Sequence, residues 1–338
     1  MHKRNFDVTF QEISAHRSVL YGFAALWILF LHMEAALPGT VWLWPVAWFK
    51  SAGACGVEVF LLLTGFGLYR SLQRDPRIGA FYRRRFERVF LPAFVVVAVY
   101  YGLKDTGALR YLSQLTLFGY WIGRPVPWYA PFILTMYLIY PAIYRIQARH
   151  PRALWALLAA SLGLSFIVAQ EIVWVPQDCQ RAFTRIPVFL AGCMLAPKLE
   201  KSARIPGWML PASLAVCAAA AFGFARIGLI NYFSRSIVYF LLAIFMILLV
   251  TMVARGLTRF GAGRGVYRCL ALCGQVSLEI YLLFGRLLPG IQAVCDGASA
   301  WKINLTAAIF TLLLAFPLRW FCELLVRQFR AVTVPEQR

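Results

Sequence analysis

Charged side chains are scarce in this chain, and acidic ones are the scarcest. Only 14% of the 338 residues are Asp, Glu, Lys or Arg, and Asp and Glu together number 14. A soluble globule of this length needs much more polar surface to face water. The composition therefore excludes a soluble protein, and a hydrophobic share of 61% with 11 Trp residues indicates a membrane protein with interfacial aromatic belts.

Motifs that mark several other kinds of site are also missing. The eight cysteines include no C-x-x-C pair, which argues against a zinc ribbon or a thioredoxin-like site, and the one-turn spacing of Cys269 and Cys273 fits small buried side chains. No Walker loop, Gly-rich dinucleotide loop or metal-ligand cluster occurs. We therefore expect no metal and no permanently bound cofactor.

The net charge of +20 arises from Lys and Arg residues that cluster between apolar runs. Such clusters are typical of the loops that set membrane topology, whereas a nucleic-acid surface would gather them on one polar face. We expect no nucleic-acid partner. The partner that this composition predicts is the lipid bilayer.

Apolar runs long enough to cross a bilayer as helices number ten. With the N-terminus inside, 23 of the 34 Lys and Arg residues fall in inner connections and 8 in outer ones, which is the bias that orients membrane proteins. The sequence thus predicts an all-α polytopic membrane protein of about ten transmembrane helices with cytoplasmic N- and C-termini. The expected spans are residues 18–37, 51–69, 89–104, 128–146, 153–172, 184–198, 208–226, 236–254, 268–290 and 304–326.

The expected domain organisation is simple. Residues 1–17 form a cytoplasmic segment without cleavable signal architecture, residues 18–326 a single transmembrane domain, and residues 327–338 a cytoplasmic tail. Residues 106–127 are too short and too broken by Gly and Pro to form a span. We interpret them as an excursion on the outer face.

The first expected span carries the most informative side chain, His32. A titratable imidazole in an apolar helix is costly and marks a candidate functional site. Helical spacing places Tyr21, Ala25, Ile28 and His32 on one face, and Arg17 about 22 Å before His32 at the other end of the helix. Glu58 of the second span lies at a similar depth, where a carboxylate can orient the imidazole. The alternative is an interfacial histidine that is hydrogen-bonded to a neighbouring carbonyl.

The densest charge cluster runs from Arg70 to Arg88. Within it, Arg85 and Arg88 lie three residues apart on one helical face, where their guanidinium groups can grip phosphates from the inner side. A topology-setting anchor explains the same arginines without any ligand. Both interpretations remain open on the sequence alone.

Three further charges lie inside apolar runs and must find partners or face water. Glu279 and Arg286, two helical turns apart, can neutralise each other or pair with Arg185 or Glu58. Aromatic side chains at Trp128, Tyr129 and Tyr281 are either interfacial or line a sugar site. A lone histidine with intramembrane carboxylates and arginines fits both a proton-coupled transporter and a transferase.

Six segments in the right order resemble the acyltransferase-3 family of bacterial inner-membrane O-acyltransferases. They are the histidine of the first span, GVEVFLLLTGFGLYRS, FYRRRFERVFLP, WYAPFILTMYLIYP, RIPVFLAG and SLEIYL, which extend from about residue 17 to 290. The resemblance implies a ten-helix core in the bacterial inner membrane. It also implies transfer of an acyl group, commonly acetyl and sometimes succinyl, from cytoplasmic acyl-CoA to a saccharide on the other side.

The resemblance assigns roles to individual residues. It implies that His32 is catalytic with Glu58 at the acidic position beside it, and that Arg85 and Arg88 hold the phosphates of acyl-CoA, the donor co-substrate. Many members carry an arginine at the position of Tyr21, and Arg17 is the candidate to replace it. The remaining candidates, for holding a saccharide or glycolipid acceptor or stabilising an oxyanion, are Trp128, Tyr129, Arg185, Glu279, Tyr281 and Arg286.

Two departures from the family pattern accompany Tyr21. Ile133 stands where many members have Glu, and Phe284 where the ninth-span motif often ends in His. These changes leave two alternatives open. The protein is either an enzyme with a different donor or acceptor, or an inactive scaffold of a polysaccharide machine. A proton-coupled saccharide transporter or exporter is the rival from another class. Polysaccharide biosynthesis proteins are the expected protein partners.

Overall fold

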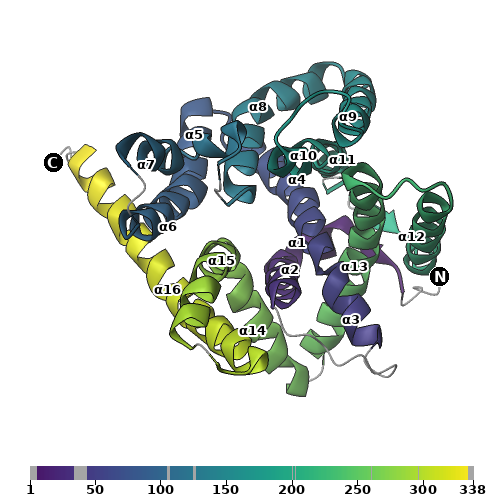
Figure 1. The fold of residues 1–338 in the computed structure, drawn as a ribbon. Coiled ribbons are helices and arrows are strands. Elements are labelled where there is room, and N and C mark those ends of the chain that lie inside the picture. The colour runs from purple at the N-terminus through teal and green to yellow at the C-terminus, as the bar shows by residue number, and fades with distance from the viewer. Residues whose placement is uncertain are drawn as a thin grey trace.

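Almost all regular structure in the computed structural model is helical (Figure 1). The structure describes residues 6–33, 44–104, 107–124, 127–199, 201, 203–259, 261–295 and 297–333. In these residues the one strand pair is a short antiparallel ladder in which β1 (Val8–Thr9) pairs with β2 (Arg204–Ile205). The predicted all-α membrane protein is confirmed at this level.

The first half of the chain forms helices of very different lengths. They are α1 (Phe10–Ala15), α2 (Arg17–His32), α3 (Trp44–Ser51), the 3₁₀ turn η2 (Ala52–Cys55), α4 (Gly56–Arg74), α5 (Ile78–Arg85), the π turn η3 (Phe86–Phe90), α6 (Leu91–Gly102), α7 (Ala108–Leu115), the 3₁₀ turn η4 (Phe118–Ile122) and α8 (Tyr129–Arg149). Residues 34–37 of the first expected span lie outside the described residues. α7 and η4 are each too short to cross a bilayer, as expected for 106–127.

The second half contains the longest helices. They are α9 (Ala153–Ala169), α10 (Gln177–Phe183), α11 (Ile186–Leu195) with η5 (Ala196–Leu199), α12 (Met209–Arg226), α13 (Tyr232–Arg259), η6 (Gly261–Gly263), α14 (Arg264–Gln275), α15 (Ser277–Val294) and α16 (Ala300–Thr333). In Figure 1, α16 runs along one edge of the molecule and α12 lies at the opposite edge.

Only some of the described helices are long enough to span a membrane. Within the described residues, four are long and apolar enough: Pro45–Arg74, α12, α13 and α16, with the bent pair α14–α15 as a fifth candidate. α2 and α9 are apolar but shorter. The count of ten spans and the cytoplasmic placement of the termini therefore stay predictions.

The expected ninth span, 268–290, is wrong as a single helix. α14 ends at Gln275, α15 begins at Ser277, and their axes bend by 73°. The backbone carbonyl of Gln275, left without a helical partner at this break, accepts hydrogen bonds from Arg88 Nη2 at 2.7 Å and from Arg319 Nη1. Cations at a helix C-terminus stabilise such carbonyls, so two distant arginines support the bend.

Glycines allow α2 to pack in backbone contact with α14. A Cβ atom added to Gly274 would lie 1.8 Å from the Ser18 carbonyl oxygen, and one added to Gly22 would lie 1.8 Å from the Leu270 carbonyl oxygen. α4 and α11 approach similarly at Gly65, where a Cβ atom would lie 2.4 Å from a backbone carbon. Small residues permit this close approach of membrane helices. Gly65 therefore permits close packing of α4 against α11.

The segment before α2 is docked on the rest of the protein. Thr9 and Glu12 form a capping box at the start of α1. Glu12 pairs with Arg255 at 3.4 Å, and Ser14 accepts a hydrogen bond from Arg70 at 2.8 Å. Connections that the charge distribution assigns to the inner side therefore contact one another.

The connections assigned to the outer side also meet. The Tyr120 hydroxyl donates to the Asp178 carbonyl at 2.6 Å, which joins η4 to α10. The Asn231 amide donates to the Gln170 side chain at 3.2 Å and joins the loops after α12 and α9. Connections assigned to the inner side thus contact one another, and so do connections assigned to the outer side.

Candidate functional site

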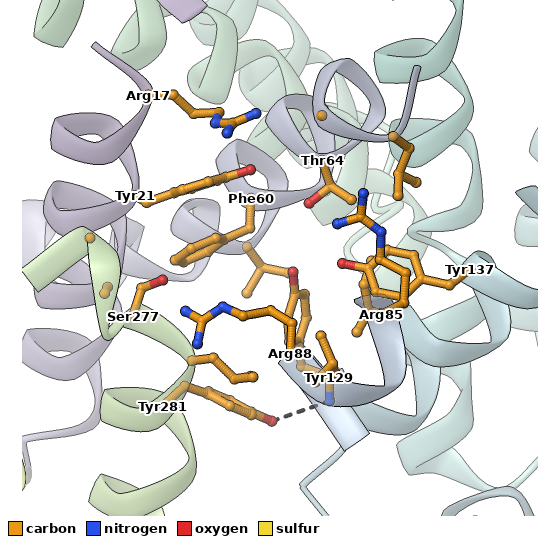
Figure 2. A pocket seen from close by; sticks show the side chains of 18 of the residues that line it. Arg17, Tyr21, Phe60, Thr64, Arg85, Arg88, Tyr129, Tyr137, Ser277 and Tyr281 are labelled. Carbon is orange, nitrogen blue, oxygen red and sulfur yellow. Dashed lines mark hydrogen bonds between the residues drawn. The ribbon is translucent and has the colours of Figure 1, made fainter. Parts of the chain in front are cut away.

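A cavity of about 300 Å³ lies among α2, α4, α5, η3, α8, α14 and α15 (Figure 2). Its wall on α2 consists of Arg17, Tyr21, Ala25 and Ile28. At 1.5 Å per residue this stripe runs about 16 Å along the helix axis. Of the four residues predicted to share one face of α2, Tyr21, Ala25 and Ile28 line this cavity and His32 does not. We call this space the central cavity.

Three arginines enter the central cavity from different elements (Figure 2). Arg17 comes from the first turn of α2, Arg85 from the last turn of α5 and Arg88 from η3. Turns of π-helix occur frequently at functional sites. Arg85 and Arg88 thus line the same cavity together with Arg17, and the predicted role of the pair in holding phosphates stays a prediction.

The three arginines differ in how well they are neutralised. Arg88 Nη1 pairs with Glu279 at 2.6 Å, and the Glu279 side chain is completely buried. Arg85 stacks over the rings of Phe81 at 5.3 Å and Tyr137 at 5.6 Å, and its Nε is buried without a hydrogen-bond partner. Among the described residues neither Arg17 nor Arg85 forms an ion pair. The uncompensated positive charge of the cavity therefore lies on these two side chains.

The rest of the wall is largely aromatic with hydroxyl groups. The ring of Tyr21 stacks on Phe60 with centroids 5.1 Å apart. The Tyr281 hydroxyl accepts a hydrogen bond from the Tyr129 backbone N–H at 3.2 Å, and both side chains line the cavity. Aromatic and hydroxyl groups together give an apolar wall with a few polar contacts, which is typical of small-molecule sites.

His32 lies one turn beyond Ile28 on α2 and is exposed. Its Nδ1 is 2.8 Å from the Ile28 carbonyl oxygen. A carbonyl can only accept, so this contact assigns the proton to Nδ1 and leaves Nε2 free as a base. The same contact is what the interfacial alternative predicts. The geometry thus gives His32 the tautomer of a general base one turn beyond Ile28, and His32 itself is not among the residues that line the central cavity.

The expected contact between Glu58 and His32 does not occur in the described part of the chain. Glu58 is completely buried and forms an ion pair with Arg185 Nε at 3.1 Å. The Arg185 guanidinium also stacks over the Trp128 ring at 5.1 Å. A buried carboxylate needs a cation, and Arg185, at the start of α11, supplies one. The correction places Glu58, Arg185 and Trp128 in one cluster beside the cavity rather than in its wall.

The two partners considered for Glu279 from the sequence, Arg286 and Arg185, are both corrected. Glu279 pairs with Arg88, as described above, and Arg286 stacks over Tyr100 and Tyr101 of α6 at 4.7 Å and 5.4 Å. Two turns of helix separate the two side chains along α15, and each meets a different neighbour. Of the predicted acceptor-binding residues, the central cavity includes Tyr129 and Tyr281 only.

Some cavity residues were missed from the sequence. Phe60, Tyr137 and Ser277 line the cavity without having been assigned a ligand. The signal for Tyr137 was available, because Tyr129, Ile133 and Tyr137 repeat every four residues on one face of α8. No signal pointed to Phe60, whose neighbours on α4 are equally apolar.

Comparisons with known proteins point in one direction. A family model described as an acyltransferase domain matches residues 19–323. Nodulation protein 10 of Rhizobium leguminosarum bv. viciae is 28% identical over 200 residues, which cover 50% of this chain and 52% of that protein. The chain thus spans about half the length of this curated relative. No solved structure matches the chain.

Proposed function

Because the chain belongs to the acyltransferase-3 family, we propose that it is a membrane O-acyltransferase that uses acyl-CoA from the cytoplasm. The acceptor is a hydroxyl group of a saccharide or lipid-linked saccharide on the other side of the bacterial inner membrane. Acetyl is the proposed acyl group, with succinyl as the alternative. Polysaccharide biosynthesis proteins are the proposed partners, since they supply such an acceptor.

One observation supports this proposal: the stripe of α2 that lines the central cavity begins at the cation Arg17 and ends at Ile28, one helical turn before His32. Arg17 and Arg85 offer positive charge without an acidic partner in the described residues. Tyr21, Ala25 and Ile28 continue the wall along α2, and His32 follows at the next helical position. Acyl-CoA fits this order of residues, because it is a long molecule with anionic phosphates at one end and a reactive thioester at the other.

In the proposed reaction His32 is the general base. Its Nε2 removes the proton from the acceptor hydroxyl as the oxygen attacks the thioester carbonyl carbon. The carbon–sulfur bond then breaks, and the CoA thiolate takes the proton from the imidazolium. The Ile28 carbonyl oxygen, 2.8 Å from Nδ1, stabilises the imidazolium that forms between the two steps. We assign no part in this step to Arg185 and Arg286, because Arg185 pairs with Glu58 and Arg286 stacks over Tyr100 and Tyr101.

Replacement of His32 tests the proposal. In proteoliposomes supplied with acetyl-CoA and a membrane glycan fraction, His32→Ala is expected to lower acetyl transfer about 10²-fold or more. The thermal unfolding temperature should stay unchanged because the side chain is exposed. His150→Ala is the matched control, since His150 is another exposed histidine at the end of α8. Wild-type acylation by folded His32→Ala protein would refute the assignment.

The same proteoliposomes separate the transporter alternative. A proton-coupled saccharide transporter requires flux that follows an imposed pH gradient and leaves acyl-CoA unconsumed. The acyltransferase requires free CoA to appear in proportion to acylated glycan. Mass spectrometry of the product names the acyl group and the acceptor together.

A further inference from the structure

A second hollow of about 440 Å³ adjoins the central cavity. It lies between the start of α2, the last turns of α4 and the end of α5, and we call it the basic vestibule. It shares Arg17 and Gly67 with the central cavity. Its lining residues are Ser14, Arg17, Gly67, Arg70, Ser71, Arg74, Asp75 and Arg84.

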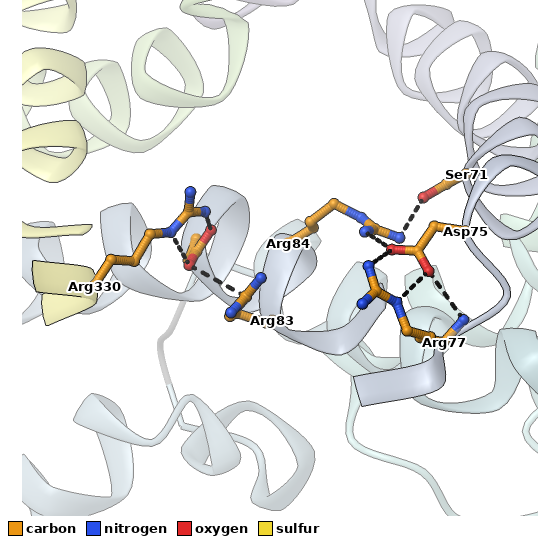
Figure 3. A network of polar contacts seen from close by, with 7 residues as sticks. Ser71, Asp75, Arg77, Arg83, Arg84 and Arg330 are labelled. Carbon is orange, nitrogen blue, oxygen red and sulfur yellow. Dashed lines mark hydrogen bonds and ion pairs between the residues drawn. The ribbon is translucent and has the colours of Figure 1, made fainter. Parts of the chain in front are cut away.

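The basic vestibule holds four arginines against one carboxylate. Asp75 pairs with Arg84 at 2.7 Å and with Arg77 at 2.9 Å (Figure 3). Hydrogen bonds from Arg77 and Arg84 hold the pKa of Asp75 well below its usual range, so this carboxylate is ionised. The basic vestibule therefore carries a net positive charge even when the negative charge of Asp75 is included.

The arginines of the basic vestibule line a concave surface together with hydroxyl groups. Arg70 Nη1 donates to Ser14 at 2.8 Å, and Arg84 Nη2 contacts Ser71 at 3.4 Å. A cation that only sets topology needs neither a hollow nor a fixed orientation. Several oriented guanidinium groups with adjacent hydroxyls form a site for phosphate groups.

Arg17 stands where the basic vestibule meets the central cavity. A Cβ atom added to Gly67 would lie 3.0 Å from Arg17 Nη1, so the guanidinium lies directly against the backbone of α4 at this glycine. A side chain at position 67 would be tight against this guanidinium, which would have to shift by a few tenths of an ångström. Gly67 thus gives Arg17 access to both spaces.

Acyl-CoA has an anionic part and a neutral part, as the basic vestibule and the central cavity are respectively strongly basic and largely aromatic. Its 3′-phosphorylated ADP end is a polyanion, its pantetheine arm is neutral, and the diphosphate joins them. We propose, on the basis of the proposed acyl-CoA-dependent function, that the basic vestibule binds the 3′-phospho-ADP end of the donor. Arg70 and Arg74 contact the nucleotide phosphates, Arg17 contacts the diphosphate at the junction, and Arg84 stays paired with Asp75 at 2.7 Å.

This inference moves the phosphates away from the Arg85–Arg88 pair. Glu279 already neutralises Arg88, and the Gln275 carbonyl occupies its second Nη. Arg85 lies deeper, between the rings of Phe81 and Tyr137. Its position suits an amide carbonyl of the pantetheine arm, which is an uncharged acceptor within an aromatic wall.

Binding of adenosine 3′,5′-bisphosphate to the detergent-solubilised full chain tests the vestibule without any acyl transfer. Arg70→Gln with Arg74→Gln is expected to raise the Kd about tenfold or more, because charge-assisted hydrogen bonds are lost. The matched control is Arg145→Gln with Arg149→Gln, which removes two exposed cations at the end of α8 that line neither the vestibule nor the central cavity. The control should change the Kd less than twofold. If the double variant does not fold, Arg74→Gln alone serves, since Arg74 is exposed.

Kinetics with two donors separate the vestibule from the proposed function. The vestibule variant should raise KM for acetyl-CoA without changing kcat, and should leave the turnover of acetyl-pantetheine, which lacks the nucleotide, unchanged. An unaltered Kd in the vestibule variant, or an equal rise in the Arg145–Arg149 control, would overturn the vestibule and leave the role of His32 standing. Selective loss of nucleotide binding without acyl transfer from any thioester would support the vestibule as a nucleotide site and sink the proposed function.

Discussion

The buried ion pair between Glu58 and Arg185 leads to the sharpest prediction about stability. Arg185→Met would leave the Glu58 carboxylate, 0% exposed, without its cation. At the observed 3.1 Å and an effective dielectric constant of about 20, the attraction lost is about 5 kcal/mol. Measured losses on breaking buried pairs are about 3–5 kcal/mol. We expect destabilisation in that range.

Replacing Glu58 should destabilise the protein less than Arg185→Met does, and replacing both residues should destabilise it less still. Glu58→Gln leaves Arg185 charged, but the guanidinium keeps the Trp128 ring at 5.1 Å and the Arg181 carbonyl at 3.2 Å. Combining Glu58→Gln with Arg185→Met removes both charges at similar volume, which is often close to neutral. The cycle should therefore show a coupling energy of about 2–4 kcal/mol.

Thermal unfolding in detergent, followed with a thiol-reactive dye, measures this cycle. The dye suits the chain because most of its eight cysteines are buried and all are free. Domains of 150–250 residues lose about 2–4 °C per kcal/mol, so a drop of at least about 5 °C is expected for Arg185→Met. Wild-type stability of that variant would refute the structural role. So would Glu58→Gln protein with an unchanged unfolding temperature and a kcat lowered about 10²-fold, which would return Glu58 to the catalytic machinery.

Two further predictions concern glycine packing and pH. Gly274→Ala should cost more than about 3 kcal/mol of unfolding free energy, because its Cβ atom would lie 1.8 Å from the Ser18 carbonyl oxygen. The control is Gly223→Ala in α12, whose Cβ atom would have no neighbour within 4 Å, and which should be neutral or stabilise the protein by up to about 1 kcal/mol. Thermal unfolding of both variants checks this. Asp75→Asn should tighten adenosine 3′,5′-bisphosphate binding about two- to fivefold by removing a like charge. Because Arg77 and Arg84 keep the pKa of Asp75 well below its usual range, Asp75 stays ionised from about pH 8 to pH 5, and over this range the gain should change only as the phosphates of the ligand titrate near about pH 6. A gain that disappears completely at about pH 5, where the ligand still carries negative charge, would contradict that ionisation.

Features that depend on local periodicity were readable from the sequence. The apolar runs and scarce charges predicted a helical membrane protein, because each run by itself must satisfy its backbone within the bilayer. The spacing of Tyr21, Ala25, Ile28 and His32 predicted one face of α2, because residues three or four apart lie on the same side of a helix, and the first three of them line the central cavity. The family motifs likewise placed Arg85 and Arg88 at one site, and both line the central cavity.

The choice of partners was decided only by the tertiary structure. Glu58 lies at a depth that fitted His32, yet packing of α4 against α11 brings Arg185 to it from 127 positions along the chain. Glu279 had Arg286 on its own helix, yet it pairs with Arg88, 191 residues away. A buried charge pairs with the counter-ion that helix packing brings within a few ångströms, and sequence spacing carries no record of that distance.

The same reason explains the bend and the vestibule. Residues 268–290 read as one span because their composition is continuous, but the carbonyl of Gln275 is satisfied by arginines from η3 and α16, which stabilises a break. The arginines at 70, 74 and 84 read as a topology signal, and only the meeting of α2, α4 and α5 turns them into a hollow beside Arg17. The sequence by itself determined which segments are helical and apolar and which residues share a helical face. The tertiary structure decided which charges neutralise each other and which remain open to a ligand, because these depend on contacts between helices far apart in the chain.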